Sequence, residues 1–242
     1  MLDEDATPLL PDIVYQNLRR KILNGALKPG QRLRQEELSR ELDVSRVPLR
    51  EAMTRLASDG LVVLNPRRGY AVTSLRSSEI LEIFELRAVV EEHAGYCAAY
   101  ARSEQDVAEV ERILIASEAS NLGSGNSMEN WTQLNYQFHA RIIASTRREH
   151  LLKFATQLRD TVEPYIRVET SMTGDVEEAQ RDHRRLFEAY RDGDAAELAR
   201  LSREHVEKTA RRLLRGLRQR QSSQEPQYPA PKAKIAHPVN ET

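Results

Sequence analysis

Residues 33–73 restrict the fold of this chain more than any other segment, because two short helical patterns are followed there by two apolar stretches around a loop. In the first pattern, residues 35–42, Leu38 and Leu42 lie four positions apart and so share one face of a helix. Residues 43–44 then form a tight turn before the second pattern begins. The segment therefore predicts a helix–turn–helix.

The second helix of this pair is expected to begin near Arg46. Ser45 is a good N-cap, and Pro48 is tolerated early in a helix, where its missing N–H is not needed. The Asp-Gly pair at 59–60 is expected to end the helix. Its predicted buried stripe consists of Leu49, Ala52, Met53, Leu56 and Ala57. The opposite, solvent-facing side then carries Arg46 and Arg50.

A β-hairpin is predicted directly after this helix. Residues 61–64 and 70–73 read as short strands, and the proline and glycine of residues 65–69 are typical of the loop between them. Two adjacent arginines, Arg67 and Arg68, lie in that loop. The hairpin has the sequence pattern of a basic wing.

Arginine at the start of the second helix suits the major groove of DNA, where a guanidinium pairs bidentately with guanine, while wing arginines reach phosphate or the minor groove. This chemistry needs no metal or cofactor. Double-stranded DNA is thus the predicted partner of the segment. The alternative at this point is a small helical domain that merely has surface arginines.

Charge supports the DNA interpretation, although the whole chain carries a net charge of only −1. Residues 11–76 contain thirteen lysines and arginines against seven acidic residues, a net of +6. Residues 1–10 contribute −3 and residues 77–242 contribute −4. The positive charge is therefore concentrated where the motif lies, as expected for a nucleic-acid-binding domain, although a solvated basic face would give the same count.

The N-terminal segment resembles the GntR family of bacterial transcription regulators through ILNGALKPGQRL, ELSRELDVSRVPLREAMTRLASDGLV and the PRRGYAV wing. In the FadR branch of that family, arginines of the second helix read the operator. The DNA-contacting residues that the resemblance implies here are Arg34, Ser45, Arg46, Val47, Arg50, Arg67, Arg68 and Gly69. One departure is Glu36, which stands where the fatty-acid-responsive member has an arginine.

The remainder of the chain predicts a second, all-α domain. With 242 residues and 40% hydrophobic content, there is core enough for two domains. Helical periodicity covers 77–217, with breaks that divide it into six helices. These breaks fall near residues 101–103, 123–126, 146–148, 174 and 193. Residues 1–10 and the polar, proline-rich 218–242 are expected to be disordered, because they cannot bury enough apolar surface.

The cellular setting predicted from the sequence is the bacterial cytoplasm. There is no signal-peptide pattern and no run of eighteen apolar residues, so neither export nor a membrane partner is expected. The single cysteine, Cys97, excludes an intramolecular disulfide and lies among alanines. It is interpreted as a small buried hydrophobe, with no catalytic role.

Three of the six histidines fall on apolar helical stripes. Asn135 and His139 lie one turn apart on a stripe with Trp131 and Phe138, and His183 and His205 lie on two further stripes. Burying an imidazole costs roughly 1–3 kcal/mol unless its nitrogens find partners. A shared metal ion would be the partner of one nitrogen in each ring. Zinc is the first expectation, with nickel or iron as alternatives. Hydrogen-bonded core histidines are the other interpretation.

The helical region is similar to the FCD effector domain through LNYQFHARIIAS, DHRRLFEAYRDGDAAEL and REHVEKTARRL. The resemblance implies divalent-metal ligands at Asn135, His139, His183 and His205, with asparagine where many members have aspartate. It also implies an arginine that holds a small carboxylate effector, for which Arg87 is the candidate. An ordinary surface pair between Arg87 and Glu91 is the alternative.

The function predicted from these features is a DNA-binding transcription regulator, in the form of a repressor that binds a palindromic operator as a homodimer and responds to a small organic acid. The response is expected to pass through the linker at 74–78. An architectural DNA-binding dimer without effector is the alternative. A metal-dependent hydrolase is a further one, but the chain has no HExxH motif, phosphate-binding glycine loop or nucleophile elbow, so no enzyme is predicted.

Overall fold

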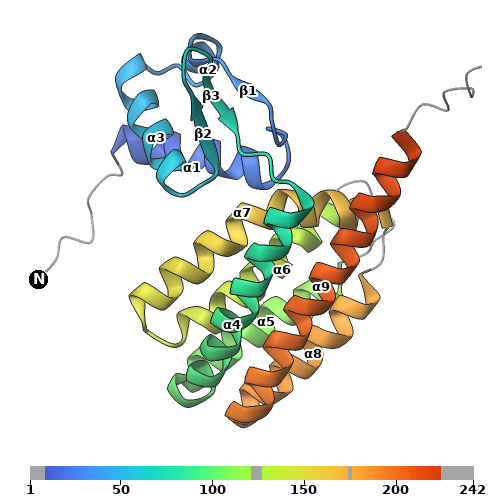
Figure 1. The fold of residues 1–242 in the computed structure, drawn as a ribbon. Coiled ribbons are helices and arrows are strands. Elements are labelled where there is room, and N and C mark those ends of the chain that lie inside the picture. Colours follow the sequence, from blue (N-terminus) through green and yellow to red (C-terminus); the bar gives the residue numbers. More distant parts are fainter. Residues whose placement is uncertain (1–8, 121–126, 174–175, 225–242) are drawn as a thin grey trace, which may run out of the picture.

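The structure of the protein is a computed structural model, which describes residues 9–120, 127–173 and 176–224. A small N-terminal domain with three helices and a sheet lies beside a larger bundle of helices (Figure 1). This confirms the predicted class, mainly α with an N-terminal winged helix–turn–helix. The disorder expected at both ends of the chain falls largely on residues that lie outside the described ranges.

The N-terminal domain packs its helices against a three-stranded antiparallel sheet of order β1-β3-β2. The helices are α1 (Leu10–Leu23), α2 (Gln35–Glu41) and α3 (Arg46–Ser58). The strands are β1 (Arg32–Leu33), β2 (Val62–Asn65) and β3 (Gly69–Val72). Tyr70 on β3 lies opposite Leu33 on one side and Leu64 on the other. The two-residue β1 was not predicted, because a strand so short has no periodicity to detect.

The helix–turn–helix follows the predicted boundaries. Asp43 has a φ of 50° in the turn, and Ser45 is the N-cap of α3 as expected, although its side chain makes no capping hydrogen bond. The helix ends at Ser58 with Asp59 as its C-cap, and Gly60 has a φ of 78°, a conformation that glycine adopts at little cost. Fully buried side chains hold this domain together: Leu18, Ile22, Leu49, Met53 and Leu56.

The C-terminal domain consists, in its described residues, of the six predicted helices. They are α4 (Ser77–Ala101), α5 (Glu104–Glu118), α6 (Ser127–Ala144), α7 (Glu149–Thr173), α8 (Glu177–Asp192) and α9 (Ala195–Gln224). Ser103 caps α5 through a capping box with Asp106, and Gly193 ends α8 with a φ of 75°. The breaks expected at 123–126 and 174 lie outside the described residues.

The last helix is longer than expected. The predicted end of the domain at Leu217 is wrong, because α9 continues to Gln224. Adding residues to an existing helix costs little, since each adds one backbone hydrogen bond, and no helix-breaking residue follows until Pro226. Composition alone therefore placed this boundary too early.

Close contact between α4 and α9 organises the bundle. A Cβ atom on Gly95 of α4 would lie 2.7 Å from the Ser202 hydroxyl and 3.1 Å from the Leu198 carbonyl oxygen of α9. Only a residue without a side chain allows the two backbones to approach so closely. The adjoining cores include Phe84, Val206, Ala98 and Tyr190.

The two domains meet chiefly where α1 approaches α7 (Figure 1). The backbone N–H of Leu75, in the linker, donates to the Tyr165 hydroxyl of α7 at 2.6 Å. A groove of about 940 Å³ borders the contact and is lined by residues of α1, α6 and α7. In the described ranges, no helix is apolar over a length that would span a membrane.

The helical glycines Gly95 and Gly216 make a matched pair for testing the α4–α9 contact. Gly95→Ala is expected to lower the free energy of unfolding by about 1–3 kcal/mol, because the added methyl group overlaps backbone and hydroxyl atoms of α9. Gly216→Ala, whose Cβ would meet only Glu169 Cγ at 3.4 Å, is expected to raise it by about 0.5–1 kcal/mol through helix propensity. Urea unfolding of both variants measures the difference. A stabilised Gly95→Ala variant would show that the helices have room to spare.

Candidate nucleic-acid interface and metal centre

The exposed side of α3 carries the residues predicted to read DNA. Arg46, Val47 and Arg50 are all exposed in its first two turns, and Ser45 lies exposed just before them. Val47 exposes 67% of its surface on this side of the helix. These side chains are free to contact a groove or backbone of DNA.

The wing presents its arginines on a tight turn. The Arg68 N–H donates to the Asn65 carbonyl at 3.1 Å, with Pro66 and Arg67 between them. Arg67 has a φ of 65°, which fits the third position of a type II turn, where glycine or asparagine is usual. Gly69 follows with a φ of 79°. A non-glycine residue held in the left-handed region costs free energy and is found most often at functional sites.

The acidic residues near this surface pair with its arginines. Glu36 on α2 accepts from Arg46 at 2.9 Å, and Glu37 accepts from Arg34 at 2.7 Å. Both pairs are exposed, so each contributes little to stability and is readily exchanged for a phosphate. Glu36 thus orients Arg46 of α3.

Deep in the helical domain, the three predicted histidines come together from α6, α8 and α9. One ring nitrogen from each of His139, His183 and His205 lies within 4.8 Å of the others, and all three residues are buried. The Nε2 atoms of His139 and His183 are 3.2 Å apart. Two nitrogens bound at about 2.1 Å to one tetrahedral ion lie roughly 3.4 Å apart, so the spacing fits a shared metal.

Burial lowers the pKa of all three imidazoles, for His139 and His183 well below the ordinary value of 6.5. Nearby arginines lower it further, because a second positive charge is unfavourable beside them. The neutral imidazole is the form that binds a metal ion. The electrostatics of the site therefore agree with its geometry.

Asp182 holds His205 from behind the cluster. Its Oδ2 atom lies 3.5 Å from His205 Nδ1, which leaves Nε2 of the ring for the cluster. Burial opposes ionisation of Asp182, but the nearby His205 and the hydrogen bond from Lys208 more than offset this and lower its pKa. A carboxylate behind a metal-binding histidine commonly fixes its tautomer and orientation.

Asn135, the fourth predicted ligand, is buried one helical turn before His139. It lines a small cavity together with His139 and His205. Its amide oxygen is a suitable donor for a divalent ion. The cavity measures about 20 Å³, which is room for an ion or a single water molecule. The chain's own side chains thus offer four donors for a divalent metal, and an ion that takes five or six ligands would keep a coordination position free.

The predicted effector arginine, Arg87, lies on the wall of this cavity and is only 3% exposed. It donates to Glu91 at 2.8 Å, so the pair considered as a surface alternative does exist, but it is buried. A second arginine, Arg159 of α7, contacts the other oxygen of Glu91 at 3.3 Å. Burial alone would raise the pKa of Glu91, and the two guanidiniums lower it instead.

Several polar groups on the cavity wall have no hydrogen-bond partner within the described part of the chain. They include Nη1 of Arg87, Nε of Arg159, the indole N–H of Trp131 and the hydroxyl of Thr170. Buried donors without partners are costly, by about 1–3 kcal/mol each. The set consists mainly of donors, two of them cationic, which suits an anion.

Comparison with known proteins agrees with this architecture. The profile of the bacterial regulatory proteins of the gntR family matches residues 11–72, and that of the FCD domain matches residues 82–208. The chain belongs to the GntR family. It is a transcription regulator with a DNA-binding and an effector domain, and not an enzyme.

Individual relatives of this GntR protein support the assignment. It is 31% identical to the uncharacterized HTH-type transcriptional regulator YdhC of Bacillus subtilis, over 72% of this chain and 77% of that one. It is 28% identical to the HTH-type transcriptional repressor GlaR of Escherichia coli, over 79% and 90%. The solved structure of E. coli McbR/YncC superposes with a TM-score of 0.79 at 23% identity, covering 87% of this chain and all of that one.

Sequence reasoning missed three residues of the site in this GntR protein. Arg159 and Asp182 lie on strongly amphipathic helices, where a charged residue reads as exposed. Trp131 was noted only as part of an apolar stripe. The position of Asp182 directly before His183 was the one available signal, because a carboxylate next to a candidate ligand can support another ligand.

Proposed function

We propose that this GntR protein is a repressor whose operator binding is controlled by a small carboxylate at a divalent-metal site in its FCD domain. The observation that carries the proposal is the convergence of three buried histidines, His139, His183 and His205, beside a small cavity that two arginines also line. The operator lies in the bacterial cytoplasm, where the protein would act. The name of GlaR, a repressor with 28% identity, favours repression.

Operator recognition would fall to α3 and the wing. Arg46 and Arg50 would contact base edges, with Val47 and Ser45 against the backbone, while Arg67, Arg68, Gly69 and Arg34 would approach phosphates or the minor groove. Exposure of all the arginines supports these roles. The type II turn supports a wing of defined shape.

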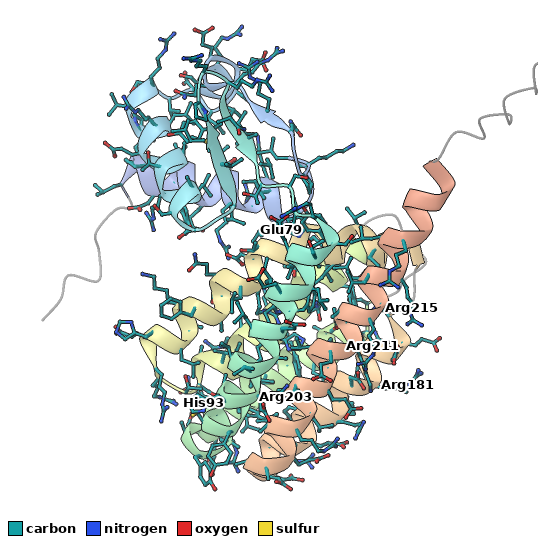
Figure 2. All side chains as sticks on the ribbon, in the orientation of Figure 1. Glu79, His93, Arg181, Arg203, Arg211 and Arg215 are labelled. Carbon is teal, nitrogen blue, oxygen red and sulfur yellow. The ribbon has the colours of Figure 1, made fainter. Side chains whose placement is uncertain are left out.

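Replacement of Arg50 tests base reading. Arg50→Ala is expected to weaken specific binding by roughly 1–3 kcal/mol, because a bidentate contact is lost. Binding would be measured by fluorescence anisotropy on a duplex selected from a random pool with the wild-type protein. Arg181→Ala, on the outer face of the helical domain (Figure 2), is the matched loss of an exposed arginine and should leave binding unchanged. Equal affinities for the wild type and Arg50→Ala would contradict the proposal.

Metal binding would use the three imidazoles together with the carbonyl oxygen of Asn135. Zinc fits nitrogen ligands of this kind best, and nickel or iron would accept the same set. When bound, the ion would supply a Lewis-acidic position for one carboxylate oxygen. Arg87 would hold the other, and Arg159 would add a second cationic group. Because the cavity is small, it must widen to admit the effector.

Loss of one imidazole tests the metal centre. His183→Ala is expected to reduce bound zinc from about one ion per chain to a small fraction, since removing a ligand leaves too few donors for tight binding. Elemental analysis of dialysed full-length protein gives the metal content. His150→Ala, which removes an exposed histidine of α7, should retain the wild-type content. Full zinc content in His183→Ala would reject the site.

A homodimer is favoured by the exposed face of α4 as well as by the need to address two half-sites. Leu86, Val89, Tyr96 and Tyr100 expose 46–71% of their surfaces at steps of three, seven and four residues. Together with His93 they form one stripe, and His93 lies at the outside of the bundle in Figure 2. A continuous apolar stripe on a surface helix is typical of an interface.

A charge in the middle of this stripe tests the dimer. Val89→Glu is expected to shift the protein toward a monomer, because the new carboxylate of each protomer would face the apolar surface of its partner. Sedimentation velocity at several concentrations reports the association state. Ile115→Glu places the same charge at a similarly exposed aliphatic position on α5 and should not change it. Two variants that behave alike would exclude α4 as the interface.

A further inference from the structure

Arg19 is the one side chain of α1 whose hydrogen bonds, among those of the described residues, reach into the helical domain. Its Nε donates to Asp160 Oδ2 of α7 at 2.9 Å, and its Nη2 donates to the Tyr136 hydroxyl of α6 at 2.8 Å. The Tyr136 hydroxyl donates in turn to Asp160 Oδ1 at 2.9 Å. Each of the three groups is therefore tied to the other two, across the boundary between domains.

This triad is largely withdrawn from water. The side chain of Asp160 is 6% exposed and that of Arg19 is 20% exposed. An ion pair at that depth is costly to break on one side only, because the remaining charge stays desolvated. On the side where the groove of about 940 Å³ runs, α1 is not packed closely against the bundle. Arg19 thus fixes α1 against a bundle that otherwise leaves it room to move.

Both partners of Arg19 are chain neighbours of cavity residues. Tyr136 follows Asn135 on α6, and Asp160 follows Arg159 on α7. Asn135 and Arg159 line the cavity of the histidine cluster. Each of these two helices therefore presents one residue to the cavity and the next to the DNA-binding domain.

A shared aromatic ring makes the connection closer. The guanidinium of Arg159 lies 5.7 Å from the centre of the Tyr136 ring, and that of Arg19 lies 5.8 Å from the same centre. Both are at the distance of a cation–π contact. Arg159 also makes the longer of the two contacts with Glu91, at 3.3 Å against 2.8 Å for Arg87. An anion in the cavity would draw Arg159 from Glu91 and from the ring.

The backbone of α7 offers a place for such a movement. Pro164 lies inside the helix and has no N–H to donate to the carbonyl oxygen of residue 160. A helix bends most readily at a proline, and this one follows the cavity residue Arg159 and Asp160 by one turn. The linker is attached just beyond it, where Tyr165 accepts from the Leu75 N–H.

We infer that Arg19, Tyr136 and Asp160 form an interdomain clasp that transmits occupancy of the histidine-lined cavity to α1 of the DNA-binding domain. The inference rests on the proposed function, because it takes the cavity as the place where metal and effector bind. It moves the point of control from the linker to a contact between α1 and the bundle. A bound ligand acts on the clasp only to the extent that it binds the clasped and released states unequally.

The test measures amide hydrogen exchange by mass spectrometry in the full-length protein, with zinc alone as the probe. In the wild type, loading the metal-stripped protein with Zn²⁺ should change exchange in α6, α8 and α9, and also in α1, by roughly 2- to 30-fold. In Arg19→Gln the bundle should respond as before, with the same zinc content, while α1 does not. Tyr136→Phe, which keeps the ring and loses the hydroxyl, should give an intermediate response.

Arg20→Gln is the matched control, since Arg20 is the next residue on α1 and is exposed. Its α1 response should equal that of the wild type. If α1 responds to zinc equally in Arg19→Gln and the wild type, the clasp is refuted. If the wild type takes up a full zinc load and α1 shows no response, it is refuted as well.

A metal-independent comparison separates failure of the clasp from failure of the proposed metal site. Arg159→Gln in the metal-stripped protein should change exchange in α1 when Arg19 is present, and should have no such effect in the Arg19→Gln background. Additive effects of the two substitutions would overturn the clasp whether or not the wild type binds zinc. Absence of zinc from the wild type, combined with non-additivity, would reject the metal site and retain the clasp.

Discussion

Burial of ionised and polar side chains in the middle of a helical bundle is the constraint on which the rest of this structure depends. Such groups are tolerated away from water only where partners of opposite charge or hydrogen-bonding capacity lie within reach. Glu91 on α4 is that partner for Arg87 of its own helix and for Arg159 of α7. One turn further, Gly95 allows α9 to approach and bring His205 to the same region. The contacts that pack the bundle therefore also assemble the cavity.

The same constraint explains why the cavity suits regulation. Its donors are satisfied incompletely by the protein, so an anion gains more there than on the surface. Packing of the apolar cores on either side offsets the unfavourable free energy of leaving these donors without partners. In the proposed function, a bound anion would satisfy these donors, and the helices that carry them would respond to its binding.

The two domains use charge differently. In the DNA-binding domain, Arg46 of α3 and Arg34 before α2 are exposed and paired weakly with Glu36 and Glu37, so phosphate can replace the carboxylates. Inside the bundle, Arg87 and Arg159 are buried and held by the carboxylate of Glu91, which is buried as well. Arg19 lies between these regimes, as a residue of the DNA-binding domain whose partners belong to the effector domain. This intermediate position is the basis of the proposed clasp.

Sequence by itself determined the elements and much of the chemistry of this protein. Local signals were sufficient for the helix–turn–helix, the wing, the six helices and the inward faces of His139, His183 and His205, because periodicity, caps and turns act over a few residues. The tertiary structure alone decided that Arg87 and Glu91 are buried, that Arg159 joins them from 68 positions away, and that Arg19 reaches α7 across 141 positions. Such pairings depend on how helices pack, and an amphipathic pattern does not reveal which charged residue on its polar face meets another helix instead of water.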